Sequence, residues 1–79
     1  MRRKTPKTVL TFASTGDAMA AEAAARDRGL PGRMIPIPSE ISAGCGLAWC
    51  VPAEEREALL EGLAREGLAY EAVHEVELY

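Results

Sequence analysis

Two prolines, Pro36 and Pro38, lie within a segment that otherwise has the composition of a β-strand. Proline has no backbone N–H group and cannot donate to a neighbouring strand, so prolines within sheets are confined to edges. Because one residue separates them, both missing donors face the same side of the strand. The segment from Arg33 to Ile41 is therefore predicted to form an edge strand.

An alanine-rich segment, Asp17 to Arg28, predicts a helix because alanine has the highest helix propensity. Ser14 and Thr15 are suited to cap its first turn, where Asp17 also places a negative charge that the helix dipole favours. Gly29 follows at a position where helices commonly end. The helix is predicted to begin near these caps and to end at Arg28.

Alternating apolar residues predict three further strands, from Lys7 to Ala13, from Gly46 to Val51 and from Tyr70 to Leu78. A second helix is predicted to begin at Pro52 and to end before Gly67, with leucines at helical spacing on one face. The resulting order of elements is β-α-β-β-α-β.

With right-handed crossovers, this order predicts a ferredoxin-like α+β fold. Its four-stranded antiparallel sheet has the spatial order 4-1-3-2, and both helices lie on one face. The second strand then lies at an edge, as its prolines require. Residues 1–6 are expected to form a flexible basic arm, and residues 7–79 a single domain.

The charge is unevenly distributed along the chain. Four of the nine basic residues lie within the first seven positions, and the remaining 72 residues carry five arginines and twelve acidic residues, a net charge of −7. An acidic body argues against nucleic-acid binding, which requires basic side chains. No secretory signal or membrane-length apolar run is recognised, so a cytoplasmic location with free thiols is expected. No cofactor and no metal site are predicted.

Cys45 is the most plausible reactive group, because Gly44 and Gly46 flank it and leave its sulfur accessible. The predicted topology brings the start of the third strand to the end of the first strand. Cys45 should therefore approach the beginning of the first helix. The alternative is that Cys45 is a small packed apolar residue.

The first turn of that helix offers Ser14, Thr15 and Gly16 as groups that stabilise an anion. Unpaired amides and the positive end of the helix dipole favour a thiolate there. Ser14 and Thr15 are first of all helix caps, and only secondarily donors to a bound anion. Arg33 is predicted either to balance acidic neighbours or to steer an anionic reactant.

Other side chains have structural interpretations. Cys50 is predicted to be structural, and at strand spacing its Cα lies about 16 Å from that of Cys45, too far for a disulfide. Trp49 is expected in the core rather than on a binding surface, and His74 at a surface or half-buried position rather than as a metal ligand. The helix-free face of the sheet is expected to be bare, which makes a homodimer plausible.

Three motifs resemble the bacterial DUF3343 family, whose members are described as selenium/sulfur carrier-like. They are the segments 11–15 (TFAST), 33–38 (RMIPIP) and 41–48 (ISAGCGLA). The resemblance implies a protein thiol that accepts and passes on sulfur or selenium, with Cys45 as the central cysteine. Ser42, Pro36 and Pro38 match other positions of the family pattern. Relatives often carry a basic residue where this chain has Ser39, and histidine where it has Gly16.

We therefore expect a carrier in which the Cys45 thiolate takes up sulfur or selenium from a donor protein and transfers it to an acceptor protein. Such a protein takes part in reactions without being a full enzyme. The alternative is a non-catalytic interaction module that binds a partner through the open sheet face or an edge strand.

Overall fold

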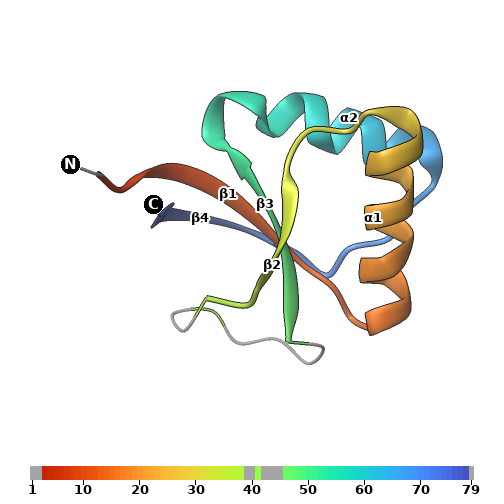
Figure 1. Ribbon diagram of the computed structural model, residues 1–79, viewed down its shortest axis with the longest axis horizontal. Coiled ribbons are helices and arrows are strands. Elements are labelled where there is room, and N and C mark those ends of the chain that lie inside the picture. Colours follow the sequence, from red (N-terminus) through yellow and green to blue (C-terminus); the bar gives the residue numbers. More distant parts are fainter. Residues whose placement is uncertain (1–2, 39–40, 42–45, 79) are drawn as a thin grey trace.

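The computed structural model describes residues 3–38, 41 and 46–78, which form an antiparallel sheet and two helices (Figure 1). The elements in chain order are β1 (Thr5–Thr11), α1 (Thr15–Arg28), β2 (Arg33–Pro36), β3 (Leu47–Pro52), a 3-10 turn η1 (Ala53–Glu55), α2 (Arg56–Glu66) and β4 (Ala72–Leu78). The strand order is β2-β3-β1-β4, and all neighbours are antiparallel. This is the predicted order 4-1-3-2 read from the other edge, so the ferredoxin-like α+β fold is confirmed.

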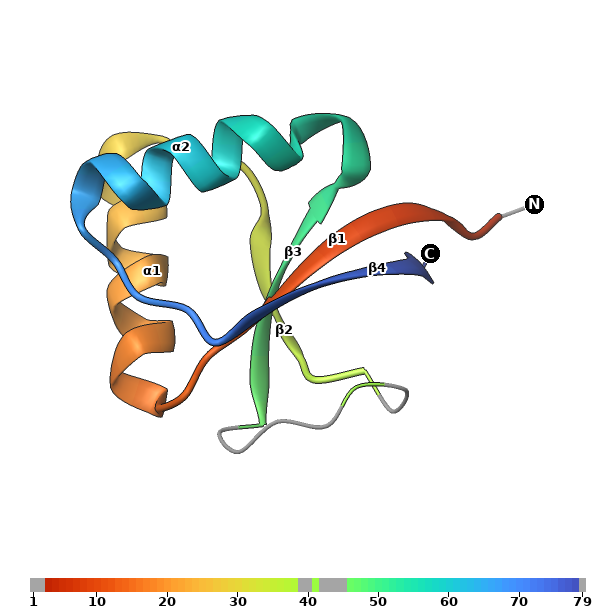
Figure 2. The same ribbon diagram turned by 180° about the vertical axis from the view of Figure 1, so that it is seen from behind.

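Both helices lie on the same face of a strongly twisted sheet, as Figures 1 and 2 show. The main core lies between the helices and the sheet. It contains Leu10, Phe12, Trp49 and Val51 from the sheet side and Ala18, Ala21, Leu59 and Leu63 from the helices. Trp49 is only 4% exposed, and its Nε1 donates a hydrogen bond to the carbonyl oxygen of Pro31 at 2.9 Å. The prediction that Trp49 belongs to the core is confirmed.

The first helix forms as its sequence predicts. Ser14 is the N-cap, and its Oγ accepts a hydrogen bond from the backbone N–H of Asp17 at 3.1 Å. The cap starts the helix at Thr15, two residues before the predicted start. Gly29 ends it in the left-handed conformation and donates its N–H to the carbonyl oxygen of Ala25 at 3.0 Å.

Several strand limits differ from the prediction because pairing partners set them. β1 begins at Thr5, two residues before the predicted start at Lys7, because Thr5 pairs with Leu78 of β4. Thr5 and Pro6 therefore belong to the sheet and not to the predicted arm. β2 ends at Pro36, where the ladder with β3 ends. Pro52, the predicted first residue of the second helix, is instead the last residue of β3, because its ψ of 144° is extended.

The opposite face of the sheet carries a second apolar cluster of Val9, Ile41, Ala48 and Cys50. Ile41, from the connection between β2 and β3, is 7% exposed and packs on this cluster, while Val9 and Ala48 are fully buried. The expectation of a bare face is therefore wrong. Cys50 is a free thiol at 4% exposure, in agreement with a structural role. A homodimer stays a prediction, although the bare face that suggested it is absent.

Within the described ranges, no helix has the length and apolar character needed to span a bilayer.

Candidate functional site

The predicted nucleophile, Cys45, and its neighbours Ser42 and Gly44 lie outside the described residues. The described residues nearest in sequence are Ile41 and Gly46, and the end of β1 and the first turn of α1 lie at the same end of the molecule.

The end of β1 and the start of β3 lie side by side, since Thr11 pairs with Ala48 in the antiparallel ladder. α1 begins at Thr15, four residues after the end of β1. The first turn of α1 and the start of β3 are consequently at the same end of the molecule, the lower end in Figure 1. The topology used to predict the site is therefore present.

The first turn of α1 has hydrogen-bond donors available. The Ser14 hydroxyl oxygen accepts from Asp17 N, and the Ser14 carbonyl oxygen accepts from Ala18 N at 3.2 Å. The backbone N–H groups of Thr15 and Gly16 have no acceptor within the described part of the chain, as expected for the first turn of a helix. These exposed donors and the helix dipole favour an anion, whereas the Asp17 carboxylate in the same turn opposes one.

Thr11 is a polar residue at this end that sequence reasoning missed. Its side chain is 1% exposed, and its Oγ1 has no hydrogen-bond partner among the described residues. A buried hydroxyl without a partner costs about 1–3 kcal/mol. Nothing in the sequence distinguishes Thr11 from the many threonines that simply favour strands. Only the packing of the tertiary structure shows that its hydroxyl is buried without a described partner.

Two backbone hydrogen bonds involve the described residues that follow β2 and precede β3. Ile37 N donates to Gly46 O at 3.0 Å, and Ile41 N donates to Pro38 O at 3.0 Å. Pro36, one of the two prolines predicted to shape the site, pairs with Leu47 at the start of β3, whereas Pro38 lies beyond the ladder. Gly46 is exposed and has a φ of 77°, and a Cβ added to it would meet no atom within 4 Å beyond its chain neighbours. Glycine is required there by backbone conformation rather than by lack of space.

Arg33 lies away from this end of the sheet. It is exposed at the start of β2, beside an open groove of about 390 Å³ whose other lining residues include Glu22 and Arg26. Arg26 lies eleven residues after the start of α1, about 16 Å along the helix axis. The structure therefore does not bring Arg33 together with Ser14, Thr15 and Gly16. No described carboxylate forms an ion pair with it.

His74 is half-buried on β4. Among residues 3–38, 41 and 46–78, no group of three or more histidine, cysteine, aspartate or glutamate side chains could hold a metal ion.

The sequence was also compared with known proteins. The model of the family described as "Putative Se/S carrier protein-like" matches residues 7–75, a range that includes Cys45 and every described element except the ends of β1 and β4. No curated protein and no solved structure matches the chain. The match covers most of the 79 residues, and the chain therefore belongs to the Se/S carrier protein-like (DUF3343) family.

Proposed function

We propose that this protein carries sulfur or selenium on Cys45 between a donor protein and an acceptor protein. The observation that supports the proposal most is the family match over residues 7–75. The family name indicates carriage of these elements and therefore interaction with other proteins.

In the proposed uptake step, the Cys45 thiolate attacks the terminal sulfur of a donor persulfide. The sulfur–sulfur bond of the donor breaks and its thiolate leaves, while a new bond forms to the Cys45 sulfur. The terminal sulfur keeps its proton, and no external oxidant or reductant is needed. In the release step, an acceptor thiolate attacks the terminal sulfur of the Cys45 persulfide. The sulfur–sulfur bond breaks, the Cys45 thiolate leaves, and the terminal sulfur is transferred to the acceptor. A selenium cargo follows the same exchange. A reducing cytosol, where thiols stay free, suits this chemistry.

Two features of the described residues support a thiolate or persulfide anion at this end of the sheet. The free N–H groups of Thr15 and Gly16 are donors at the positive end of α1. The buried Thr11 hydroxyl, at the same end of the sheet but on its helix-free face, is a further donor without a partner among the described residues. Gly46, which follows Cys45, adds no side chain that would cover the sulfur.

Mass spectrometry after incubation with a cysteine desulfurase and cysteine tests the proposal. We expect one added sulfur on the peptide that contains Cys45. Cys45→Ser should abolish it, and the matched variant Cys50→Ala should retain it because Cys50 is buried in the apolar cluster on the helix-free face of the sheet. Equal labelling of Cys45→Ser and the unaltered protein would refute the assignment.

Alkylation of the thiols across the pH range distinguishes a reactive Cys45 from a packed one. A free cysteine has a pKa of about 8.5. An activated Cys45 should react with iodoacetamide well below pH 8, whereas a packed thiol should react only after denaturation.

A further inference from the structure

The sheet has two edges, and backbone hydrogen bonding shows how each edge strand is oriented. Ile37 N donates to Gly46 O, so the polar groups of Gly46 face β2. Successive residues of a strand direct these groups to opposite sides. In the ladder between β2 and β3, Ile35 and Arg33 therefore bond to Ala48 and Cys50.

The residues of β2 that face away from the sheet are consequently Met34 and Pro36, followed just beyond the strand by Pro38. Two of these three positions lack an N–H group. A further strand could form hardly any backbone hydrogen bonds along this edge. The β2 edge is closed to strand addition.

The β4 edge is different. Glu71 N donates to Thr11 O at 2.6 Å, so the polar groups of Thr11 face β4. The same alternation makes Ala72, His74, Val76 and Leu78 the residues of β4 that bond to β1. The outward residues are then Val73, Glu75 and Glu77, and none is a proline. Each presents an N–H and a C=O group to which the described sheet offers no partner.

The side chains at this edge are acidic. Glu75 and Glu77 are exposed and two residues apart, so they lie on the same face, and Glu71 is exposed immediately before the strand. Arg56 of α2 approaches Glu75 with its guanidinium nitrogen 3.3 Å from Oε2.

We propose that the free edge of β4 docks an extended basic segment of a partner protein, which adds a fifth strand to the sheet. Backbone hydrogen bonds to Val73, Glu75 and Glu77 supply the binding energy, as in other cases of strand addition. Lysine or arginine at every second position of the segment pairs with Glu75 and Glu77. The inference goes beyond the proposed carrier chemistry and does not depend on Cys45.

A second copy of this chain fits the edge less well. Antiparallel pairing of two β4 strands centred on Glu75 sets that residue opposite its own counterpart. Like charges directly opposite one another destabilise a sheet. The charge pattern therefore favours a basic partner over self-association.

Amide hydrogen exchange, resolved by ¹⁵N NMR on the full chain, tests the proposal directly. The probe is a hexapeptide with lysine at every second position and threonine or valine between, and the control peptide has glutamate in place of lysine. At saturating basic peptide, we expect the amides of Val73, Glu75 and Glu77 to exchange about tenfold more slowly, because each gains a hydrogen bond. The inward amides of His74 and Val76 should not change.

Three results would overturn the proposal. One is the absence of slowing at the outward amides with the basic peptide. Another is equal slowing with the acidic control peptide. The third is slow exchange of the outward amides in the free protein that increases with protein concentration, which would assign the edge to a second copy.

Two variants of Glu77 separate the backbone contribution from the charge. Glu77→Pro removes one outward N–H group, as Pro36 does on β2, and Glu77→Lys reverses one charge. Each should weaken binding of the basic peptide about three- to tenfold, and added salt should reduce the effect of Glu77→Lys. The matched variant Glu22→Lys makes the same charge change on exposed α1 and should leave affinity within about twofold. Equal losses for Glu22→Lys and Glu77→Lys would show that only net charge matters.

Discussion

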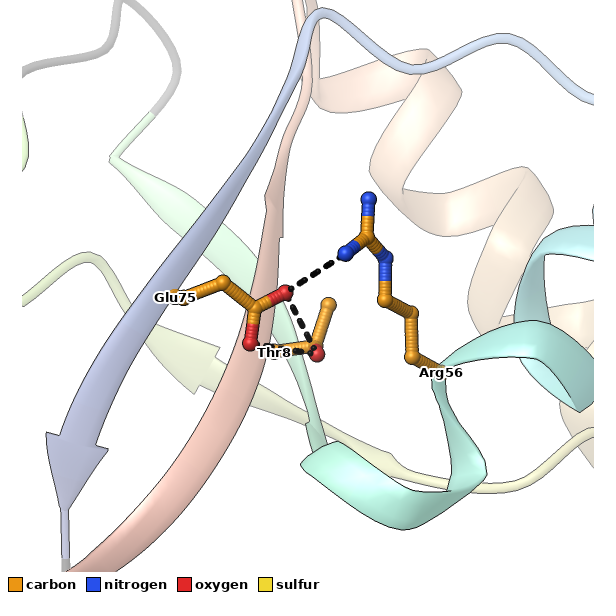
Figure 3. Close-up of polar contacts among 3 residues, drawn as sticks. All are labelled: Thr8, Arg56 and Glu75. Atoms are coloured by element: carbon orange, nitrogen blue, oxygen red, sulfur yellow. Dashed lines mark hydrogen bonds and ion pairs between the residues drawn. The ribbon is translucent and has the colours of Figure 1, made fainter.

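The hydroxyl group of Thr8, a fully buried residue of β1, donates a hydrogen bond to the carboxylate of Glu75 in β4 (Figure 3). Thr8 Oγ1 lies 3.0 Å from Oε2 and 3.2 Å from Oε1, and the two residues are direct cross-strand partners. Arg56 contacts the same carboxylate from the first turn of α2. One carboxylate thus connects β1, β4 and the second helix.

This relationship predicts the effect of removing the buried hydroxyl. Thr8→Val keeps the shape of the side chain but leaves the carboxylate without its donor from β1. The free energy of unfolding should fall by about 1 kcal/mol, measured by urea titration. In a Glu75→Ala background, the same substitution should cost nothing, because the acceptor is already absent. An equal loss in both backgrounds would mean that packing, not the hydrogen bond, explains the effect.

Gly32 is predicted to tolerate no side chain. Its φ is 102°, and an added Cβ would collide with Nε1 of Trp49 and lie 2.6 Å from the carbonyl oxygen of Cys50. Gly32→Ala should lower the free energy of unfolding by about 2 kcal/mol or more, since both the backbone conformation and the packing oppose it.

Fluorescence of Trp49, the one tryptophan of the chain, reports this unfolding in urea. Gly16→Ala is the matched control, because the nearest atom to its added Cβ, Ser14 Oγ, is 3.7 Å away. Alanine also favours helix, so this control should not lose stability. If the two variants were equally stable, the close approach at Gly32 would have no energetic consequence.

Asp17 is predicted to limit the reactivity of Cys45. Its negative charge in the first turn of α1 opposes a thiolate near the same helix end. Asp17→Asn should therefore raise the rate of Cys45 alkylation below pH 8 about twofold, as expected for a solvent-screened charge. Peptide-level mass spectrometry separates Cys45 from Cys50. Asp27→Asn, near the other end of the helix, should have no effect, and equal rates for both variants would remove α1 from the site.

Thr11 should affect stability and sulfur transfer in opposite directions. Thr11→Val removes a buried hydroxyl that has no partner among the described residues, so the free energy of unfolding should rise by about 1 kcal/mol. If that hydroxyl serves the sulfur group, persulfide formation on Cys45 should decrease in the same variant. Thr11→Ser retains the hydroxyl and should retain labelling. Unchanged labelling of Thr11→Val would exclude the hydroxyl from the site.

Much of the fold could be predicted because short-range rules decide it. The Ser14 cap and the alanine content specify α1, and proline chemistry assigns β2 to an edge. Strand limits were less predictable, since they depend on partners far along the chain. Thr5 is a strand residue because Leu78 pairs with it, and nothing near Thr5 in sequence contains that information.

The candidate site likewise has features that the sequence reveals and features that only the tertiary structure reveals. Cys45 and its glycine neighbours stand out in the sequence itself, because side-chain chemistry and backbone freedom are properties of single residues. Sequence alone also determined the order of elements and the proline-closed edge. Tertiary structure alone decided that Ile41 covers the second face, that Arg33 lies far from the first turn of α1, and that the Thr11 hydroxyl is buried without a described partner. Burial and proximity arise from packing between segments distant in sequence, and no local pattern encodes them.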